Sequence, residues 1–197
     1  ILLHGYGSDG DDLIGLAPYW AQALPDVAFV SPHAPFPCEM GPFGRQWFSL
    51  GDRSAAAMLA GTRTAADILN GFIDDELARL NLTADRMALV GFSQGTMMSL
   101  FVGPRRAQQI AGILGYSGRL IGADVLPAES VTTPPTSLIH GAADDMVPIE
   151  SLHSAVEGLA AAGIDAEHET RPGLGHSIDE VGLRIGLEFL QRVLAKN

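Results

Sequence analysis

The chain has 197 residues, of which 47% are hydrophobic, so it is long enough to form one domain with a sizeable core. Its formal net charge of −11 disfavours binding to nucleic acids and to anionic membrane surfaces, and no apolar run reaches the length of a membrane span. The single cysteine, Cys38, excludes an internal disulfide and favours a reducing, cytoplasmic compartment. We therefore expect a single domain over residues 1–197 that does not insert stably into membranes.

The first quarter of the chain predicts two strands, one helix and a long irregular segment. An apolar run over residues 1–4 predicts a strand, and because the chain begins inside it, we expect that this strand is truncated. A glycine-rich loop follows, then apolar residues at helical spacing over residues 11–24 and a second short strand over residues 27–31. Residues 32–51 are rich in proline and glycine and predict a loop.

Strands and helices alternate through the rest of the chain. Apolar runs predict strands over residues 86–92, 110–116, 136–140 and 165–171, and helical spacing predicts helices over residues 62–80, 96–102, 149–162 and 178–195. Such alternation predicts an α/β fold with a mostly parallel central sheet and helices on both faces. Ligands bind at the C-terminal ends of strands in these sheets, so we expect the functional site there.

A serine nucleophile is predicted between a strand and a helix. Gly91, Ser93 and Gly95 fit the Gly-x-Ser-x-Gly pattern of the nucleophile elbow of α/β hydrolases, in which a sharp turn lifts the serine oxygen clear of the sheet. The pattern alone is weak in a chain with 23 glycines, and an incidental serine in a βα turn is the alternative. The buried-strand and helix patterns on either side favour the elbow.

The base and the acid that such a serine needs are predicted from chain order. His176 is the one histidine in a glycine-flanked loop between the last predicted strand and the last helix, where α/β hydrolases place the base. The acid should follow an earlier strand and orient that histidine. Asp144 and Asp145 both fit this position, and spacing alone does not separate them.

An oxyanion hole and an acyl pocket complete the prediction. The backbone N–H of Gln94 should supply one donor, and the glycine-rich loop after the first strand should supply the second, for which Tyr6 is the best candidate. The loop over residues 32–51 holds unusually many large apolar side chains, which would either line a ligand pocket or cover the core as a lid. Our candidates for the pocket are Phe36, Trp47, Phe48 and Met146.

Metal and cofactor chemistry is not predicted. The sequence has no His-x-x-x-His and no cysteine pair with metal-ligand spacing, so we expect neither a metal nor a cofactor. The expected partner is a small-molecule or lipid-like ester substrate, and no nucleic acid is expected. The sequence leaves open whether the chain forms a homodimer. A hydrolase-fold binding protein without activity is the alternative of another class, but it has no need of Ser93, His176 and an acid together.

These motifs together resemble the carboxylesterase/phospholipase family of α/β hydrolases, which includes the acyl-protein thioesterases. The matching segments are residues 3–10, 47–48, 91–95, 140–148 and 175–178, in the order found in the family. The resemblance implies an α/β-hydrolase fold, Asp144 as the acid, and Tyr6 and Gln94 as the oxyanion donors. It implies hydrolysis of carboxylic esters, with lysophospholipids or acyl thioesters as alternative substrates. Tyr6 and Thr96 depart from the leucine and glycine that are common in the family.

Overall fold

Five parallel strands form the central sheet of the computed structural model, which describes residues 1–195. In spatial order they are β1 (Leu2–Leu3), β4 (Ala88–Phe92), β5 (Gly112–Tyr116), β6 (Thr136–Gly141) and β7 (Ala166–Arg171). Every neighbouring pair runs parallel, so all five strands end at the same edge of the sheet. The predicted α/β fold with a parallel sheet is confirmed.

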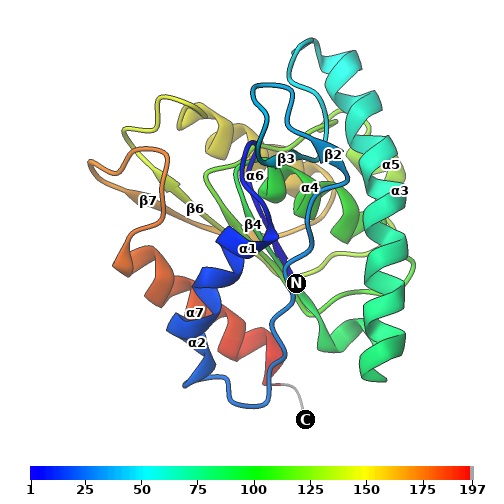
Figure 1. The fold of residues 1–197 in the computed structure, drawn as a ribbon, viewed down its shortest axis with the longest axis vertical. Coiled ribbons are helices and arrows are strands. Elements are labelled where there is room, and N and C mark those ends of the chain that lie inside the picture. Colours follow the sequence, from blue (N-terminus) through cyan, green and yellow to red (C-terminus); the bar gives the residue numbers. More distant parts are fainter. Residues whose placement is uncertain (196–197) are drawn as a thin grey trace.

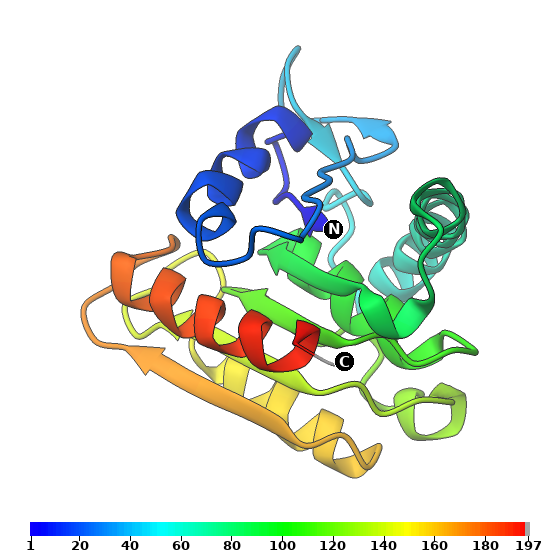
Figure 2. The ribbon, with the colours of Figure 1, turned by 90° about the horizontal axis from the view of Figure 1, so that it is seen from below.

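Helices cover both faces of this sheet (Figure 1). On one face lie α3 (Ala55–Leu80), α4 (Gln94–Val102) and α6 (Glu150–Ala161); on the other lie α1 (Gly10–Leu13), α2 (Ala17–Ala21) and α7 (Glu180–Leu194). In Figure 2 the orange strand β7 runs between the red helix α7 and the yellow helix α6. None of the helices within residues 1–195 combines the length and the apolar character that a bilayer-spanning helix needs.

Each face has its own hydrophobic core. The α3-face cluster includes Met58, Met98 and Leu159, from α3, α4 and α6, and it packs against one side of the sheet. The α7-face cluster includes Trp20 and Phe189, from α2 and α7, and it packs against the other side. The near-continuous apolar runs of the middle strands follow from this arrangement, because a strand between two cores is buried on both faces.

The structure corrects two predictions near the N-terminus. The single helix predicted over residues 11–24 is divided into α1, a 3₁₀ turn over Ile14–Leu16 and α2, which has a proline in its first turn. Residues 27–31 do not form a strand of the sheet. They run beside β1, where the Leu2 N–H donates to the Val30 carbonyl at 2.8 Å, and this single backbone bond does not make a ladder.

Three further elements differ from the predictions. Helix α3 begins at Ala55 rather than near residue 62, because the Ser54 hydroxyl accepts a hydrogen bond from the Ala57 N–H and caps a first turn of small residues. The segment over residues 32–51 contains a small antiparallel hairpin of β2 (Phe36–Pro37) and β3 (Arg45–Gln46). A short helix, α5 (Leu126–Glu129), lies in the loop after β5.

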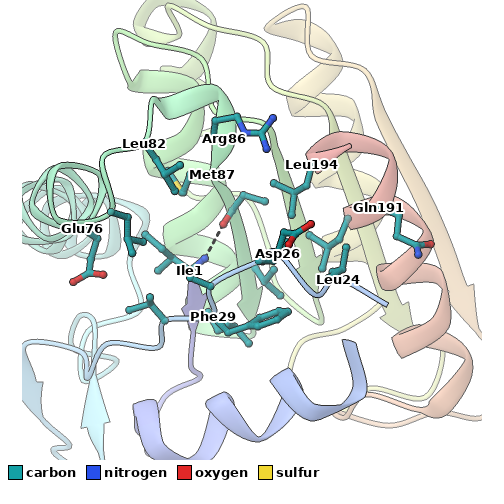
Figure 3. A pocket seen from close by; sticks show the side chains of 18 of the residues that line it. Ile1, Leu24, Asp26, Phe29, Glu76, Leu82, Arg86, Met87, Gln191 and Leu194 are labelled. Carbon is teal, nitrogen blue, oxygen red and sulfur yellow. Dashed lines mark hydrogen bonds between the residues drawn. The ribbon is translucent and has the colours of Figure 1, made fainter. Parts of the chain in front are cut away.

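An apolar cavity of about 690 Å³ lies at the start of the strands (Figure 3). Ile1, Leu24, Phe29 and Leu194 are among its lining residues. Its wall also includes Ala88, the first residue of β4, whereas the predicted nucleophile follows the last residue of that strand. The cavity is therefore separated from the predicted site by the length of the strand.

Candidate active site

Ser93 occupies a strained turn between β4 and α4. Its backbone has φ 54° and ψ −114°, a conformation that residues other than glycine rarely adopt. The Ser93 N–H donates to the carbonyl of Tyr116 at 2.9 Å, which ties the turn to β5. Strain at a serine that follows a strand and begins a helix is the geometry that the elbow pattern predicts.

Two glycines make this turn sterically feasible. A Cβ atom at Gly91 would lie 2.3 Å from the backbone nitrogen of Thr96. One at Gly95 would lie 1.8 Å from the carbonyl oxygen of Leu3, where α4 crosses β1. Both distances are to backbone atoms, which cannot swing away, so side chains at these positions would force the strand and the helix apart.

His176 lies beside the elbow, in the loop between β7 and α7. Its ring packs against Phe92, the residue before Ser93, with the ring centroids 4.9 Å apart. The Ser93 side chain makes no capping bond to α4, and within residues 1–195 its hydroxyl has no hydrogen bond to His176. Bonds between nucleophile and base are often long in unliganded enzymes and shorten when substrate binds.

Asp144 is fixed by three hydrogen bonds, one of them to His176. Its Oδ2 accepts from His176 Nδ1 at 2.7 Å, while Oδ1 accepts from the N–H groups of Met146 and Val147 at 2.9 and 2.8 Å. Burial by itself would raise the pKa of Asp144, but these bonds outweigh it and lower the pKa below its ordinary value. The carboxylate is therefore held charged and pointed at the imidazole.

Burial and contact with His176 distinguish the two candidate acids, Asp144 and Asp145. Asp144 is buried, whereas Asp145 is exposed, and no ion pair joins Asp145 to His176 within the described part of the chain.

A second histidine, His140, also contacts Asp144. Its Nε2 lies 3.4 Å from Asp144 Oδ2 and is hydrogen-bonded to the Val147 carbonyl at 2.8 Å. This contact was not predicted, and the only signal for it is the position of His140 at the end of a predicted strand.

Two backbone N–H groups beside Ser93 have no acceptor within residues 1–195. They belong to Tyr6, in the loop after β1, and to Gln94, the first residue of α4. The Tyr6 loop lies against Ser93, since a Cβ atom at Gly5 would be 3.3 Å from Ser93 Cβ. Unpaired N–H groups beside a serine are suited to stabilise an oxyanion.

The β2–β3 hairpin holds the Tyr6 loop in place. The Gly7 N–H donates to the Arg45 carbonyl at 2.9 Å, and the Arg45 N–H donates to the Ser8 carbonyl at 2.7 Å. The loop and the hairpin touch so closely that a Cβ atom at Gly44 would lie 2.1 Å from the Gly7 carbonyl oxygen. The hairpin was not predicted from sequence, and with it the support of this loop was missed.

Glu39, in the turn of the same hairpin, links it to Tyr6 and to the segment before α3. Its carboxylate accepts from the hydroxyls of Ser49 and Tyr6, at 2.6 and 3.1 Å, and from the Leu50 N–H at 2.7 Å. The bonds from Ser49 and Leu50 are the main cause of a pKa lowered to about 2. Tyr6, which stands where leucine is common in the family, thus has a hydrogen-bond acceptor in Glu39.

His4, which precedes this loop, is a structural residue. Its Nε2 accepts from the Ala34 N–H at 2.9 Å and its Nδ1 lies 2.7 Å from the Gly5 carbonyl, which together require the neutral ring. Burial lowers the pKa of His4, in keeping with a neutral side chain. This histidine therefore shapes the turn and does not serve as the base for Ser93.

The side chain of Gln94 fastens the segment after the hairpin to the elbow. Its Oε1 accepts from the Trp47 N–H and its Nε2 donates to the Phe48 carbonyl, both at 2.8 Å, and the residue is 1% exposed. Gln94 therefore has two features in the site: a backbone N–H free for an oxyanion and a side chain that positions its surroundings. Only the first is predicted from the sequence.

We expect Gln94→Ala to lower the free energy of unfolding by about 2–4 kcal/mol, because it leaves the Trp47 N–H and the Phe48 carbonyl buried without partners. Urea denaturation would measure the change, with Gln108→Ala, an exposed glutamine, as the matched control. Equal stabilities of the Gln94 and Gln108 variants would contradict the structural role given to the Gln94 side chain.

The predicted pocket residues lie in different surroundings. Trp47 and Phe48 belong to the α3-face cluster and are 2% and 1% exposed, so they form part of the wall behind the site and offer almost no accessible surface. Phe36 is half-buried in β2, and Met146 is 71% exposed beside Asp144. The assignment of these four residues to an acyl pocket stays a prediction.

Comparison with known proteins identifies relatives along the whole described chain. The family described as Phospholipase/Carboxylesterase matches residues 1–194. Acyl-protein thioesterase 1 of Gibberella zeae is 30% identical, over 92% of this chain and 86% of that protein. Esterase YpfH of Escherichia coli K12 is 28% identical, over 100% of this chain and 83% of that protein.

Comparison with solved structures identifies proteins of similar fold. The crystal structure of esterase PE8 has a TM-score of 0.93 and 42% sequence identity, and the match covers 98% of this chain and 91% of that one. Arabidopsis thaliana SOBER1 has a TM-score of 0.87 at 24% identity, over 98% of this chain and 97% of its own. The second match, at this lower identity, supports the fold alone.

Proposed function

Because the chain belongs to the phospholipase/carboxylesterase family of hydrolases, we propose that it is a serine carboxylesterase with Ser93, His176 and Asp144 as its catalytic triad. The observation that carries the proposal is the hydrogen bond of 2.7 Å between Asp144 and His176. The His176 ring also packs against Phe92, the residue before the strained Ser93. A serine hydroxyl becomes nucleophilic when a base takes its proton, and an oriented histidine is such a base.

In the first half of the reaction, Ser93 Oγ attacks the carbonyl carbon of the ester while His176 Nε2 takes the hydroxyl proton. A tetrahedral intermediate forms, and its oxyanion accepts hydrogen bonds from the N–H groups of Tyr6 and Gln94. The bond to the alcohol oxygen then breaks, His176 returns the proton to the leaving alkoxide, and the acyl group stays on Ser93.

In the second half, water replaces the alcohol. His176 takes a proton from the water as its oxygen attacks the acyl carbon, and the same two N–H groups hold the second oxyanion. Collapse of this intermediate breaks the bond to Ser93 Oγ, which recovers the proton from His176, and the carboxylic acid leaves. Asp144 keeps one tautomer of His176 and stabilises the imidazolium in both halves.

Hydrolysis of a series of p-nitrophenyl esters, from acetate to palmitate, tests this function. We expect release of p-nitrophenol from at least part of the series, with the length profile separating small esters from lipid-like ones. Absence of hydrolysis at every chain length, from a protein shown to be folded by circular dichroism, would contradict the carboxylesterase proposal.

Acyl thioesters are the second candidate substrate, favoured by the similarity to acyl-protein thioesterase 1 of Gibberella zeae. The same triad would serve, because a thiolate replaces the alkoxide as the leaving group. A comparison of kcat/KM on a simple ester, an acyl thioester and a lysophospholipid would rank the three classes. The cytoplasmic location and the homodimer stay predictions.

A further inference from the structure

Arg119 lies next to the nucleophile in the loop after β5. Its neighbour Gly118 contacts the elbow so closely that a Cβ atom there would be 3.0 Å from the Ser93 carbonyl oxygen and 2.4 Å from Thr96 Cβ. The guanidinium extends to the first turns of α3, where it contacts the thioether of Met58. Arg119 thus brings a half-buried positive charge to the edge of the sheet where Ser93 lies.

The Arg119 charge has no counter-ion among residues 1–195. Within residues 1–195 no ion pair joins a carboxylate to Arg119 or to Arg53, which precedes the cap of α3. Burial and the nearby charge of Arg53 lower the pKa of Arg119. By comparison, Arg106, which is also half-buried, pairs with Asp74 at 2.5 Å.

An unpaired, half-buried guanidinium is unfavourable, because a thioether is a weak acceptor and does not replace the lost hydration. The chain has 23 acidic residues against 12 basic ones, so partners for arginine are not scarce. The position of Arg119 beside the elbow, with Arg53 near it and no carboxylate paired with either, is accounted for if the anion arrives with the substrate. A guanidinium binds a carboxylate through two parallel hydrogen bonds.

The position of Arg119 relative to His176 indicates which part of the ester carries that anion. His176 must face the leaving alcohol to protonate it, and it contacts Phe92, which packs against the α7-face cluster. Arg119 contacts Met58 of the α3-face cluster, on the opposite side of the sheet. An acyl group on the side of Ser93 away from the leaving alcohol would then extend towards Arg119.

We propose that Arg119, assisted by Arg53, forms a subsite for a carboxylate at the far end of the acyl group. The preferred substrates would then be esters of dicarboxylic acids that keep one carboxylate free. This inference rests on the proposed esterase function and narrows its substrate class. It assigns to the two arginines a specificity role and no part in the bond-breaking steps.

The test compares two substrates that differ in one charge: mono-p-nitrophenyl glutarate, which is anionic, and p-nitrophenyl methyl glutarate, which is neutral. We expect the wild-type protein to have the higher kcat/KM on the anionic ester at low salt. Arg119→Gln should reduce the ratio of the two kcat/KM values at least about tenfold, as expected for loss of a hydrogen bond to a charged group. Added salt should reduce the same ratio in the wild type.

Two further variants make the outcome specific. Arg53→Gln, at an exposed position, should reduce the ratio about threefold and serves if Arg119→Gln does not fold. Arg184→Gln, on α7, removes the same charge from an exposed ion pair with Glu188 and should leave the ratio unchanged. A ratio near one in the wild type, or an unchanged ratio in the Arg119 variant, would overturn the subsite. Absence of hydrolysis of both esters by the wild type would instead overturn the esterase function on which it rests.

Discussion

Replacing Ser93 by alanine is expected to lower kcat for p-nitrophenyl ester hydrolysis by roughly a millionfold, the loss seen when a triad nucleophile is removed from a serine hydrolase. The strained turn holds the hydroxyl at the start of α4 beside the N–H groups of Tyr6 and Gln94. Without it no acyl-enzyme forms, and only the oxyanion donors and substrate binding remain to assist attack by water.

The control for this experiment is Ser154→Ala, on the exposed surface of α6. It removes the same hydroxyl from an exposed position outside the proposed triad and oxyanion hole, so hydrolysis should stay within about twofold of the wild type. Retention of more than a tenth of wild-type kcat by the Ser93 variant, after repurification to exclude contaminating esterase, would contradict nucleophilic catalysis by this residue.

Asp144→Asn is expected to lower kcat by about ten-thousandfold while the fold stays intact. The asparagine fills the same space, and its carbonyl oxygen can still accept from the Met146 and Val147 N–H groups that now hold the carboxylate. It cannot orient His176 as the carboxylate does, because its amide NH₂ is a donor and favours the wrong tautomer of the imidazole.

The neighbouring acid offers a matched comparison. Asp145→Asn removes the same charge one residue away, from an exposed side chain, and should leave kcat within about twofold of the wild type. Equal losses in the two variants would point to a general effect of charge in this loop, and an unaffected Asp144 variant would mean that His176 is oriented by something else.

The sequence predicts those parts of the candidate site that depend on a local rule. The elbow needs glycine on both sides of a serine between a strand and a helix. Side chains at Gly91 and Gly95 would clash with the backbone of Thr96 and of Leu3, as that rule requires. His176 followed from chain order, because parallel strands deliver their loops to one edge of the sheet. Residue types and chain order were sufficient to make both predictions.

Spacing could not separate Asp144 from Asp145, because both follow the same strand and the difference between them is a matter of burial. The structure separates them through the two N–H groups that turn Asp144 inward. Glu39 and the side chain of Gln94 were missed for another reason. Their side chains bond across 10 to 47 residues of chain, to a segment whose hairpin has strands of only two residues each.

The N-terminal helix shows the limit of periodicity. Apolar spacing over residues 11–24 continues through a 3₁₀ turn, since the same side chains reach the α7-face cluster from α1 and from α2. The pattern records which residues are buried and does not record whether the backbone between them keeps one helical geometry. Residues 27–31 fail similarly, because an apolar stretch beside a strand need not form its ladder.

Labelling with a fluorophosphonate probe, followed by peptide mapping, tests the central claim most directly. The probe phosphonylates a serine only when a base activates its hydroxyl, so the mechanism predicts one adduct, on Ser93, in the folded wild-type protein. The adduct should be absent from Ser93→Ala and should form far more slowly in Asp144→Asn. A folded protein that stays unlabelled, or an adduct on another residue that persists in the Ser93 variant, would contradict the proposed triad.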